Sequence, residues 1–221
     1  MTQLLEALAW IADPTRWSGP GSIPVRLLEH LWYTLLGVGI AALVAIPVGL
    51  LVGHTRRGRG PVVALSGAAR ALPTLGLVTL FGLWLGIGLT APVLAFVILA
   101  IPSLLAGAYS ACEAVDPRTV DAARAQGMTE WQILTRVEVP LGLPLLIGGV
   151  RLAAVQVVAT VMLASYIGNG GLGRFIFLGL NLSDYPQMLG GSILVVALAL
   201  VIDLALRLVE RLTAPRGAAR T

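Results

Sequence analysis

The run LWYTLLGVGIAALVAIPVGLLVG, residues 31–53, contains no charged side chain and decides the fold class. A helix needs about 20 largely apolar residues to cross a hydrocarbon core about 30 Å thick, and this run is long enough. Four more long apolar runs follow along the chain, at residues 61–83, 90–111, 141–167 and 188–206. We therefore predict an all-α integral membrane protein with about five transmembrane helices.

The prolines inside these runs include Pro47, Pro73 and Pro102. A proline removes one backbone donor and crowds the preceding turn, but neighbouring helices in a bundle can satisfy the freed backbone groups. We expect a kink at each of the three prolines rather than the loss of a span.

The composition agrees with a membrane protein and excludes several functions. Of 221 residues, 57% are hydrophobic and 12% charged, with a mean hydropathy of +0.89, whereas a soluble domain has about 25% charged residues. No lysine occurs, so a phosphate-binding loop of the G-x-x-x-x-G-K-[ST] type is absent and the chain is not expected to hydrolyse ATP by that route. One cysteine, Cys112, and two histidines, His30 and His54, predict neither a disulfide nor a metal site. The scattered arginines do not indicate nucleic-acid binding.

The arginines predict the orientation in the membrane, because short cytoplasmic loops are enriched in Lys and Arg. Arg56, Arg57 and Arg59 follow the first run, and further arginines occupy residues 113–140 and the C-terminal tail at residues 212–221. All three segments are expected in the cytoplasm, which places the N-terminus outside. Residues 1–30 then form an extracytoplasmic or interfacial segment of the mature chain, with an interfacial helix around Leu4, Leu5, Leu8 and Trp10.

The loop at residues 113–140 begins with the signals of a short helix. Asp116 can cap the helix, and Pro117 suits its first position because the missing N–H would have no partner there. Gly127 is suited to the left-handed conformation that ends a helix. The loop is therefore predicted to turn a corner at Gly127.

A second helix is predicted after this corner. Thr129 and Gln132 have the spacing of a capping box, and we expect Pro140 to stop the helix. Ile133, Leu134 and Val137 share one apolar face of it. The whole loop is thus expected to form a rigid cytoplasmic helix–Gly–helix hairpin.

The amino-acid sequence of this hairpin resembles the signature of ABC-transporter permeases, Glu-Ala-Ala, x3, Gly, x9, Ile-x-Leu-Pro. Here Asp121-Ala122-Ala123 is followed after three residues by Gly127 and after nine more by Val137-Glu138-Val139-Pro140. Asp replaces Glu and Val replaces both Ile and Leu, while the spacing is kept. The resemblance implies that Asp121, Ala122, Ala123, Gly127, Val137 and Pro140 belong to a coupling helix that docks in a groove of a separate ATPase subunit.

That resemblance also implies the assembly. ATP and Mg²⁺ would bind to the partner ATPase subunits, with no cofactor in this chain. A second permease, identical or related, and an extracytoplasmic substrate-binding protein would complete an importer in the bacterial plasma (inner) membrane. The permease domain would span residues 31–211.

Three further stretches narrow the resemblance to one branch. They are Leu72-Pro73-Thr74-Leu75 with Gly86-Ile87-Gly88, Val115-Asp116-Pro117 with Gln126-Gly127-Met128-Thr129, and Ile167-Gly168-Asn169-Gly170-Gly171-Leu172-Gly173. Together they are similar to permeases of osmoprotectant importers for glycine betaine, choline or carnitine. Methionine importers are the nearest alternative within the class. An integral-membrane enzyme is the alternative outside it, although no nucleophile and base lie near one another to act as catalytic residues.

Gly168, Gly170 and Gly173 also match the dinucleotide fingerprint G-x-G-x-x-G. That motif requires a preceding strand and a following helix in a βαβ unit, and here it follows a membrane span. We interpret it as a tight turn at the end of the fourth span.

Three ionisable residues lie within the apolar runs: Arg70, Arg151 and Asp203. Such residues are costly in hydrocarbon and by default indicate function. Arg151 and Asp203 both fall in the cytoplasmic half, so we hypothesise an interhelical pair. The alternative is that Asp203 pairs with Arg207 on its own helix while Arg151 extends towards the interface.

Aromatic residues make up only 6% of the chain, and Trp84 and Tyr166 lie near span ends, where aromatics commonly anchor. A quaternary amine is usually bound by aromatic faces. High-affinity recognition is therefore expected in the separate binding protein, and no substrate-binding residue is assigned.

Overall fold

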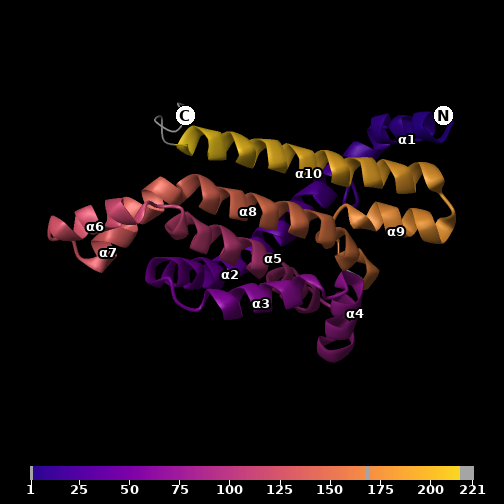
Figure 1. Cartoon of the computed structure of the whole chain (residues 1–221). Helices are drawn as coiled ribbons and strands as arrows, with labels where there is room; N and C mark the ends of the chain where they lie inside the picture. Colours follow the sequence, from indigo (N-terminus) through magenta and orange to yellow (C-terminus); the bar gives the residue numbers. More distant parts are fainter. Residues whose placement is uncertain (1, 168–169, 215–221) are drawn as a thin grey trace.

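The computed structural model describes residues 2–167 and 170–214, apart from the side chains of Leu65 and Arg70, and in that part of the chain all regular structure is helical (Figure 1). Four helices are long and apolar enough to cross a membrane: Ile23–Thr55, Thr90–Glu113, Glu130–Ile167 and Tyr185–Thr213. A bent helix pair raises the number of candidate spans to five. The predicted fold class is confirmed.

The first and last spans are longer than predicted. Helix α2 is Ile23–Thr55, so it begins well before residue 31 and takes in residues that we had assigned to the N-terminal segment. Helix α10 is Tyr185–Thr213, and Asp184 caps it by accepting a hydrogen bond from the backbone N–H of Gln187 at 3.1 Å. Helix α5, Thr90–Glu113, lies within two residues of its predicted bounds.

The second predicted span is not one helix. Helix α3, Arg59–Arg70, and helix α4, Thr74–Leu85, meet at an angle of 83°. The break falls at Pro73, which removes a backbone donor and disfavours the helical conformation at Leu72. By contrast, α2 continues through the exposed Pro47 and α5 through the buried Pro102.

The core of the bundle lies between α2, α5 and α8, Val139–Val161. Its buried side chains are mostly small or branched: Ala41, Ala45, Phe96, Ala100, Leu104, Leu105, Ala153, Val157, Val161 and Ala164. Helices α5 and α8 cross closely at Gly107 and Gly149, where a Cβ added to Gly107 would lie 2.6 Å from the Cα of Gly149. Glycine at such crossings lets helix backbones approach in a membrane, where lipid supplies no hydrophobic drive for association.

A second cluster joins the N-terminal helix to the C-terminal half of the chain. Trp10 on α1, Thr2–Ala12, meets the edge of Phe175 on α9, Gly173–Leu182, at 5.1 Å between ring centroids. Helix α9 was not predicted, because its ten residues are too short to span a membrane. Leu4, Leu5 and Leu8 on α1 are exposed, and their location at the membrane interface stays a prediction.

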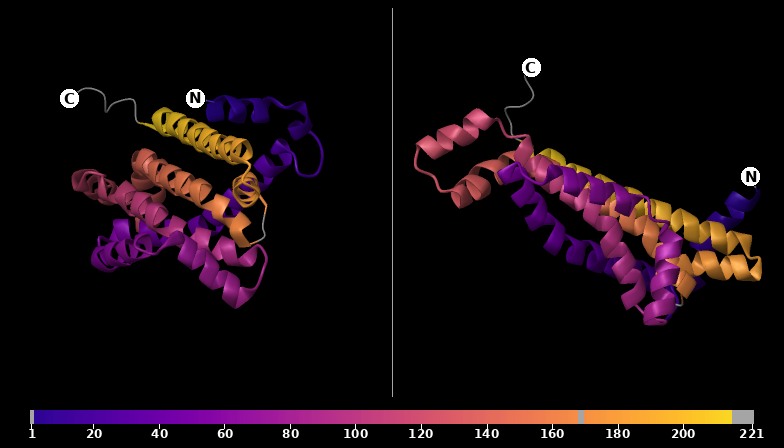
Figure 2. Two further views of the ribbon diagram at one scale, coloured as in Figure 1. Left: turned by 90° about the vertical axis from the view of Figure 1, so that its right-hand side faces the viewer. Right: turned by 60° about the horizontal axis from the view of Figure 1, so that its bottom comes forward.

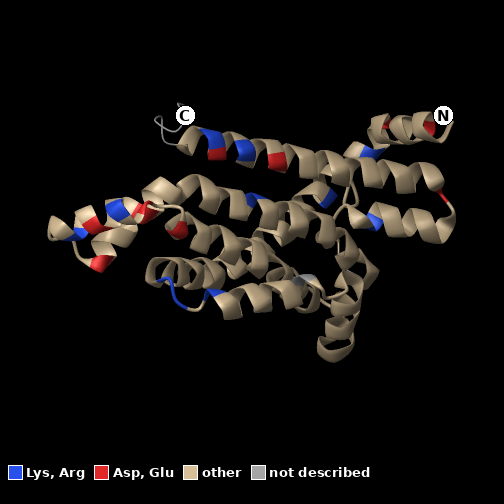
Figure 3. Cartoon of the chain, in the orientation of Figure 1, with Lys and Arg blue, Asp and Glu red and all other residues tan. Residues whose placement is uncertain are grey.

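The loop between α5 and α8 projects beyond the bundle as helices α6, Pro117–Ala125, and α7, Glu130–Ile133 (Figure 2). Charged residues gather at this end, on the hairpin, on the C-terminal part of α10 and on the link between α2 and α3 (Figure 3). Such a distribution is typical of the cytoplasmic end of a membrane bundle.

Candidate functional site

The hairpin begins as its sequence predicts. A side-chain oxygen of Asp116 accepts a hydrogen bond from the backbone N–H of Arg118 at 2.9 Å, and Pro117 is the first residue of α6. Gly127 has φ +80°, in the left-handed region, and the backbone N–H of Met128 reaches back to the carbonyl of Ala123 at 3.2 Å. The corner is therefore built by glycine and by backbone hydrogen bonds.

The second helix also begins as predicted, with a complete capping box. The backbone N–H of Thr129 donates to Gln132 Oε1 at 2.9 Å, and the backbone N–H of Gln132 donates to Thr129 Oγ1 at 3.3 Å.

Pro140 does not stop this helix, contrary to the prediction. The chain passes from α7 through a π-helical segment, Leu134–Glu138, directly into α8. In this segment the backbone N–H of Val139 bonds the carbonyl of Leu134, five residues back. We attribute the continuity to this wider turn, which makes room for a proline ring that would clash in a regular α-helix. The hairpin is thus continuous with the membrane helix α8.

The hairpin has its own small apolar interior. The buried side chains are Val115, Val120, Ala123 and Ile133, with Met128 and Val137 packed against them. Ala123 is 7% exposed and packs inside the hairpin. Asp121, Ala122 and Pro140 are exposed. Leu134 lines an apolar cavity of about 510 Å³ against α2 rather than this interior.

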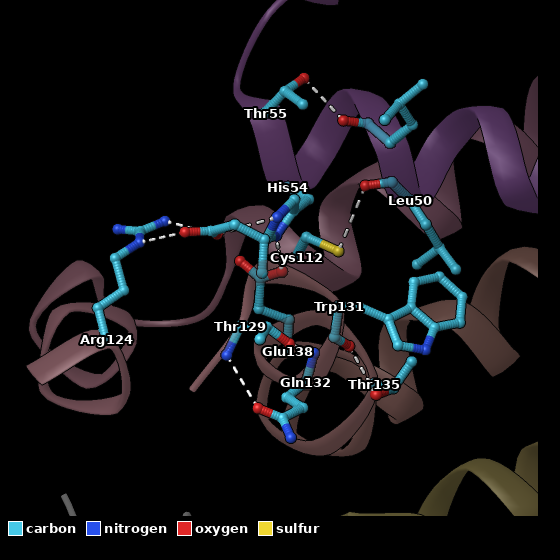
Figure 4. A network of polar contacts seen from close by, with 12 residues as sticks. Leu50, His54, Thr55, Cys112, Arg124, Thr129, Trp131, Gln132, Thr135 and Glu138 are labelled. Carbon is cyan, nitrogen blue, oxygen red and sulfur yellow. Dashed lines mark hydrogen bonds and ion pairs between the residues drawn. The ribbon is translucent and has the colours of Figure 1, made fainter. Parts of the chain in front are cut away.

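A network of charged side chains connects the hairpin to the end of α2 (Figure 4). Arg124 on α6 bonds Glu130 twice, at 2.7 and 3.0 Å, and Asp121 at 3.1 Å. Glu130 lies 3.2 Å from His54 Nε2, and His54 Nδ1 lies 2.5 Å from Glu138 Oε2. The hydrogen bond to Glu130 raises the pKa of the Arg124 guanidinium, which therefore stays charged.

His54 and Glu138 are the functional candidates that the sequence did not single out. Glu138 lies between two valines in the sequence and is 2% exposed. A carboxylate buried to this extent requires a partner. Both ring nitrogens of His54 face carboxylate oxygens, so the imidazole joins Glu130 to Glu138. The one signal in the sequence for this site was Glu138 itself, an acidic residue flanked by valines.

Arg151 and Asp203 are brought together by the structure. Arg151 Nη1 on α8 lies 2.7 Å from Asp203 Oδ1 on α10, and Arg151 Nε lies 3.1 Å from Glu210 Oε2. Glu210, two helical turns beyond Asp203, is the partner that sequence reasoning missed. Two carboxylates on α10 thus share one guanidinium on α8.

The glycine-rich turn after the fourth span contacts α2. The backbone N–H of Gly171 donates to Glu29 Oε2 at 2.8 Å, and that of Leu172 donates to His30 Nδ1 at 3.3 Å. Gly168 of the fingerprint match and the side chain of Arg70 lie outside the described residues.

These features define an α-helical membrane bundle with a helical hairpin projecting from one end. The family of binding-protein-dependent transport system inner membrane components matches residues 45–216, and the chain belongs to this family. It is accordingly a multi-pass membrane protein and a transport subunit, not an enzyme, and the family uses ATP through a partner ATPase.

The relatives include three osmolyte permeases. The chain is 32% identical to the glycine betaine/carnitine/choline transport system permease protein OpuCB of Bacillus subtilis, over 89% of this chain and 91% of the relative. It is 35% identical to the carnitine transport permease protein OpuCB of Listeria monocytogenes, over 87% and 88%. It is 31% identical to the choline transport system permease protein OpuBB of Bacillus subtilis, over 90% and 92%.

Solved structures share the fold. A chain from an inward-facing structure of the MetNI methionine ABC transporter superposes with a TM-score of 0.74, at 24% identity, covering 85% of this chain and 94% of that one. A chain from an amino acid ABC transporter crystallised with histidines gives a TM-score of 0.68, at 21% identity, covering 92% and 97%.

Proposed function

We propose that this chain is the permease subunit of an ABC importer for quaternary-amine osmoprotectants such as glycine betaine, choline or carnitine. The observation that carries the proposal is similarity over about nine-tenths of the chain to relatives named for these compounds. A methionine importer is less favoured, because the methionine transporter structures resemble the chain at 24% identity or below, which speaks for the fold alone.

We propose that α6 and α7 dock on the partner ATPase, which binds ATP and Mg²⁺. The docking surface would centre on the exposed Asp121 and Ala122, with Gly127 setting the corner and Val137 bracing the interior. Because the helix continues through Pro140 into α8, a displacement of the hairpin would move α8 as one body. Closure of two ATPase subunits would thereby reorient the spans.

The Arg151 cluster supports a path for this motion into the rest of the bundle. Its hydrogen bonds join α8, the continuation of the hairpin, to α10. The His54 network supports a second path, from the hairpin to α2. We infer that both links keep the spans moving with the hairpin.

The proposed assembly contains two permeases, identical or related, two ATPase subunits and an extracytoplasmic binding protein in the bacterial plasma membrane. The N-terminus would lie outside and the C-terminus in the cytoplasm, as the charges at the hairpin end favour.

The test is uptake by the complete transporter reconstituted in lipid vesicles. With ATP inside and binding protein outside, labelled glycine betaine, choline or carnitine should accumulate, while methionine should not. Accumulation of methionine alone would refute the proposed substrate class.

A further inference from the structure

A cavity of about 340 Å³ lies between α4, α5 and α8. Five residues line it: Thr74, Leu99, Ser103, Leu152 and Gln156. Three are polar and each comes from a different helix, while the other two are leucines. Its volume is within the range of small-molecule sites.

The cavity lies deep along the bundle. Gln156 is 16 residues beyond Pro140, or about 24 Å along the helix. Thr74 is the first residue of α4, directly after the break at Pro73. The polar groups therefore lie at the depth of the apolar spans, far from the charged hairpin. Thr74 and Ser103 are half-buried, and Gln156 is exposed.

The polar side chains of this cavity differ from three other hydroxyls in the helices. Thr79, Thr160 and Ser192 each donate a hydrogen bond to the carbonyl one helical turn earlier, at 2.8 to 2.9 Å. Within residues 2–167 and 170–214, the hydroxyls of Thr74 and Ser103 and the carboxamide of Gln156 donate no hydrogen bond to a group of the chain. Polar groups in a membrane bundle face water-filled paths or binding sites, since hydrocarbon would leave them unpaired.

The lining residues suit one part of a zwitterionic quaternary amine, its carboxylate. Hydroxyls and a carboxamide donate hydrogen bonds to a carboxylate, whereas the absence of aromatic and acidic residues among the five lining residues leaves nothing to attract the cation. The two leucines give methyl groups an apolar wall. A site without a charged partner also binds weakly, as a conducting path requires.

We propose that Thr74, Ser103 and Gln156 form a transient site on the translocation path that binds the carboxylate of a zwitterionic substrate. The inference rests on the proposed function and adds a selectivity that this function does not contain: glycine betaine and carnitine use the site fully, and choline, which lacks a carboxylate, does so less.

The experiment compares uptake of glycine betaine and choline by the complete transporter in vesicles. Gln156→Leu and Ser103→Ala each remove hydrogen-bonding groups from the cavity. Ser110→Ala is the matched control, since Ser110 lies on the same helix two turns further and does not line the cavity. Membrane abundance and basal ATP hydrolysis report on folding.

The betaine-to-choline ratio of maximal uptake rates should fall about tenfold in Gln156→Leu, the effect of losing one hydrogen bond to a charged group. Ser103→Ala should lower it in the same direction, and Ser110→Ala should leave it unchanged. If the betaine-to-choline ratio stayed unchanged in both cavity variants, the inference would be overturned and the proposed function would remain intact. An equal fall in the uptake rates of both substrates counts as an unchanged ratio. Uptake of neither amine by the wild type would overturn the proposed function, and uptake of choline alone would overturn the carboxylate assignment.

Discussion

Replacing His54 by alanine should destabilise the protein strongly, because the change strands a buried acid. The side chain of Glu138 is 3% exposed and has His54 at 2.5 Å. Removing the partner of a buried polar group costs about 1 to 3 kcal/mol, because the group is left without its hydrogen bond. In a chain of this size each kcal/mol lowers Tm by about 2 to 4 °C, so His54→Ala should lower Tm by about 2 to 12 °C.

The assay is thermal unfolding of the purified transporter in detergent, followed by a double-mutant cycle. His54→Leu combined with Glu138→Leu should recover most of the loss, because no buried acid is left without a partner. Arg59→Ala is the matched control: its pair with Glu113 spans 3.6 Å and the arginine is 64% exposed, so less than about 1 kcal/mol is expected. If His54→Ala matched Arg59→Ala in Tm, the network would not secure the hairpin to α2.

Two further predictions concern orientation and the Arg151 cluster. On a Cys112-free background, a cysteine at Arg57 should be protected from an impermeant thiol reagent in intact cells and one at Asn181 should react; the reverse would refute the orientation. Arg151→Ala should cost about 1 to 3 kcal/mol, more than Asp203→Ala, because it strands two carboxylates while Asp203→Ala leaves the pair with Glu210. Their double mutant should lose less stability than the sum of the two, and strictly additive losses in Tm would show that the pair does not act as a unit.

The sequence predicted most of the architecture because its signals are local. The apolar runs predicted the spans. Asp116, Gly127 and the Thr129 capping box predicted the hairpin, because each of these signals acts within one turn of the chain. The prediction that Pro140 stops the helix was wrong, because no single residue type signals the π-helical segment that precedes it.

Long-range contacts explain the remaining differences. The break at Pro73 and the continuity at Pro102 involve the same residue type, so a proline alone does not tell whether a helix breaks. His54 and Glu138 are 84 residues apart, so their pairing had no sequence pattern to reveal it. The Arg151–Asp203 pair was foreseeable because two charges at similar depth in adjacent spans lower each other's cost.

The proposal that the hairpin couples ATP hydrolysis to transport is tested most directly by the number of substrate molecules moved per ATP hydrolysed. This ratio should be measured in vesicles for the wild type, Asp121→Arg, Gly127→Pro and the control Gly127→Asn. Asp121 is exposed, so reversing its charge should spare the fold while weakening docking. Proline cannot adopt φ +80°, whereas asparagine tolerates it. We expect the ratio to fall at least about tenfold in Asp121→Arg and Gly127→Pro, with normal membrane abundance, and to stay near wild type in Gly127→Asn. A wild-type ratio in both Asp121→Arg and Gly127→Pro would contradict a coupling role for the hairpin.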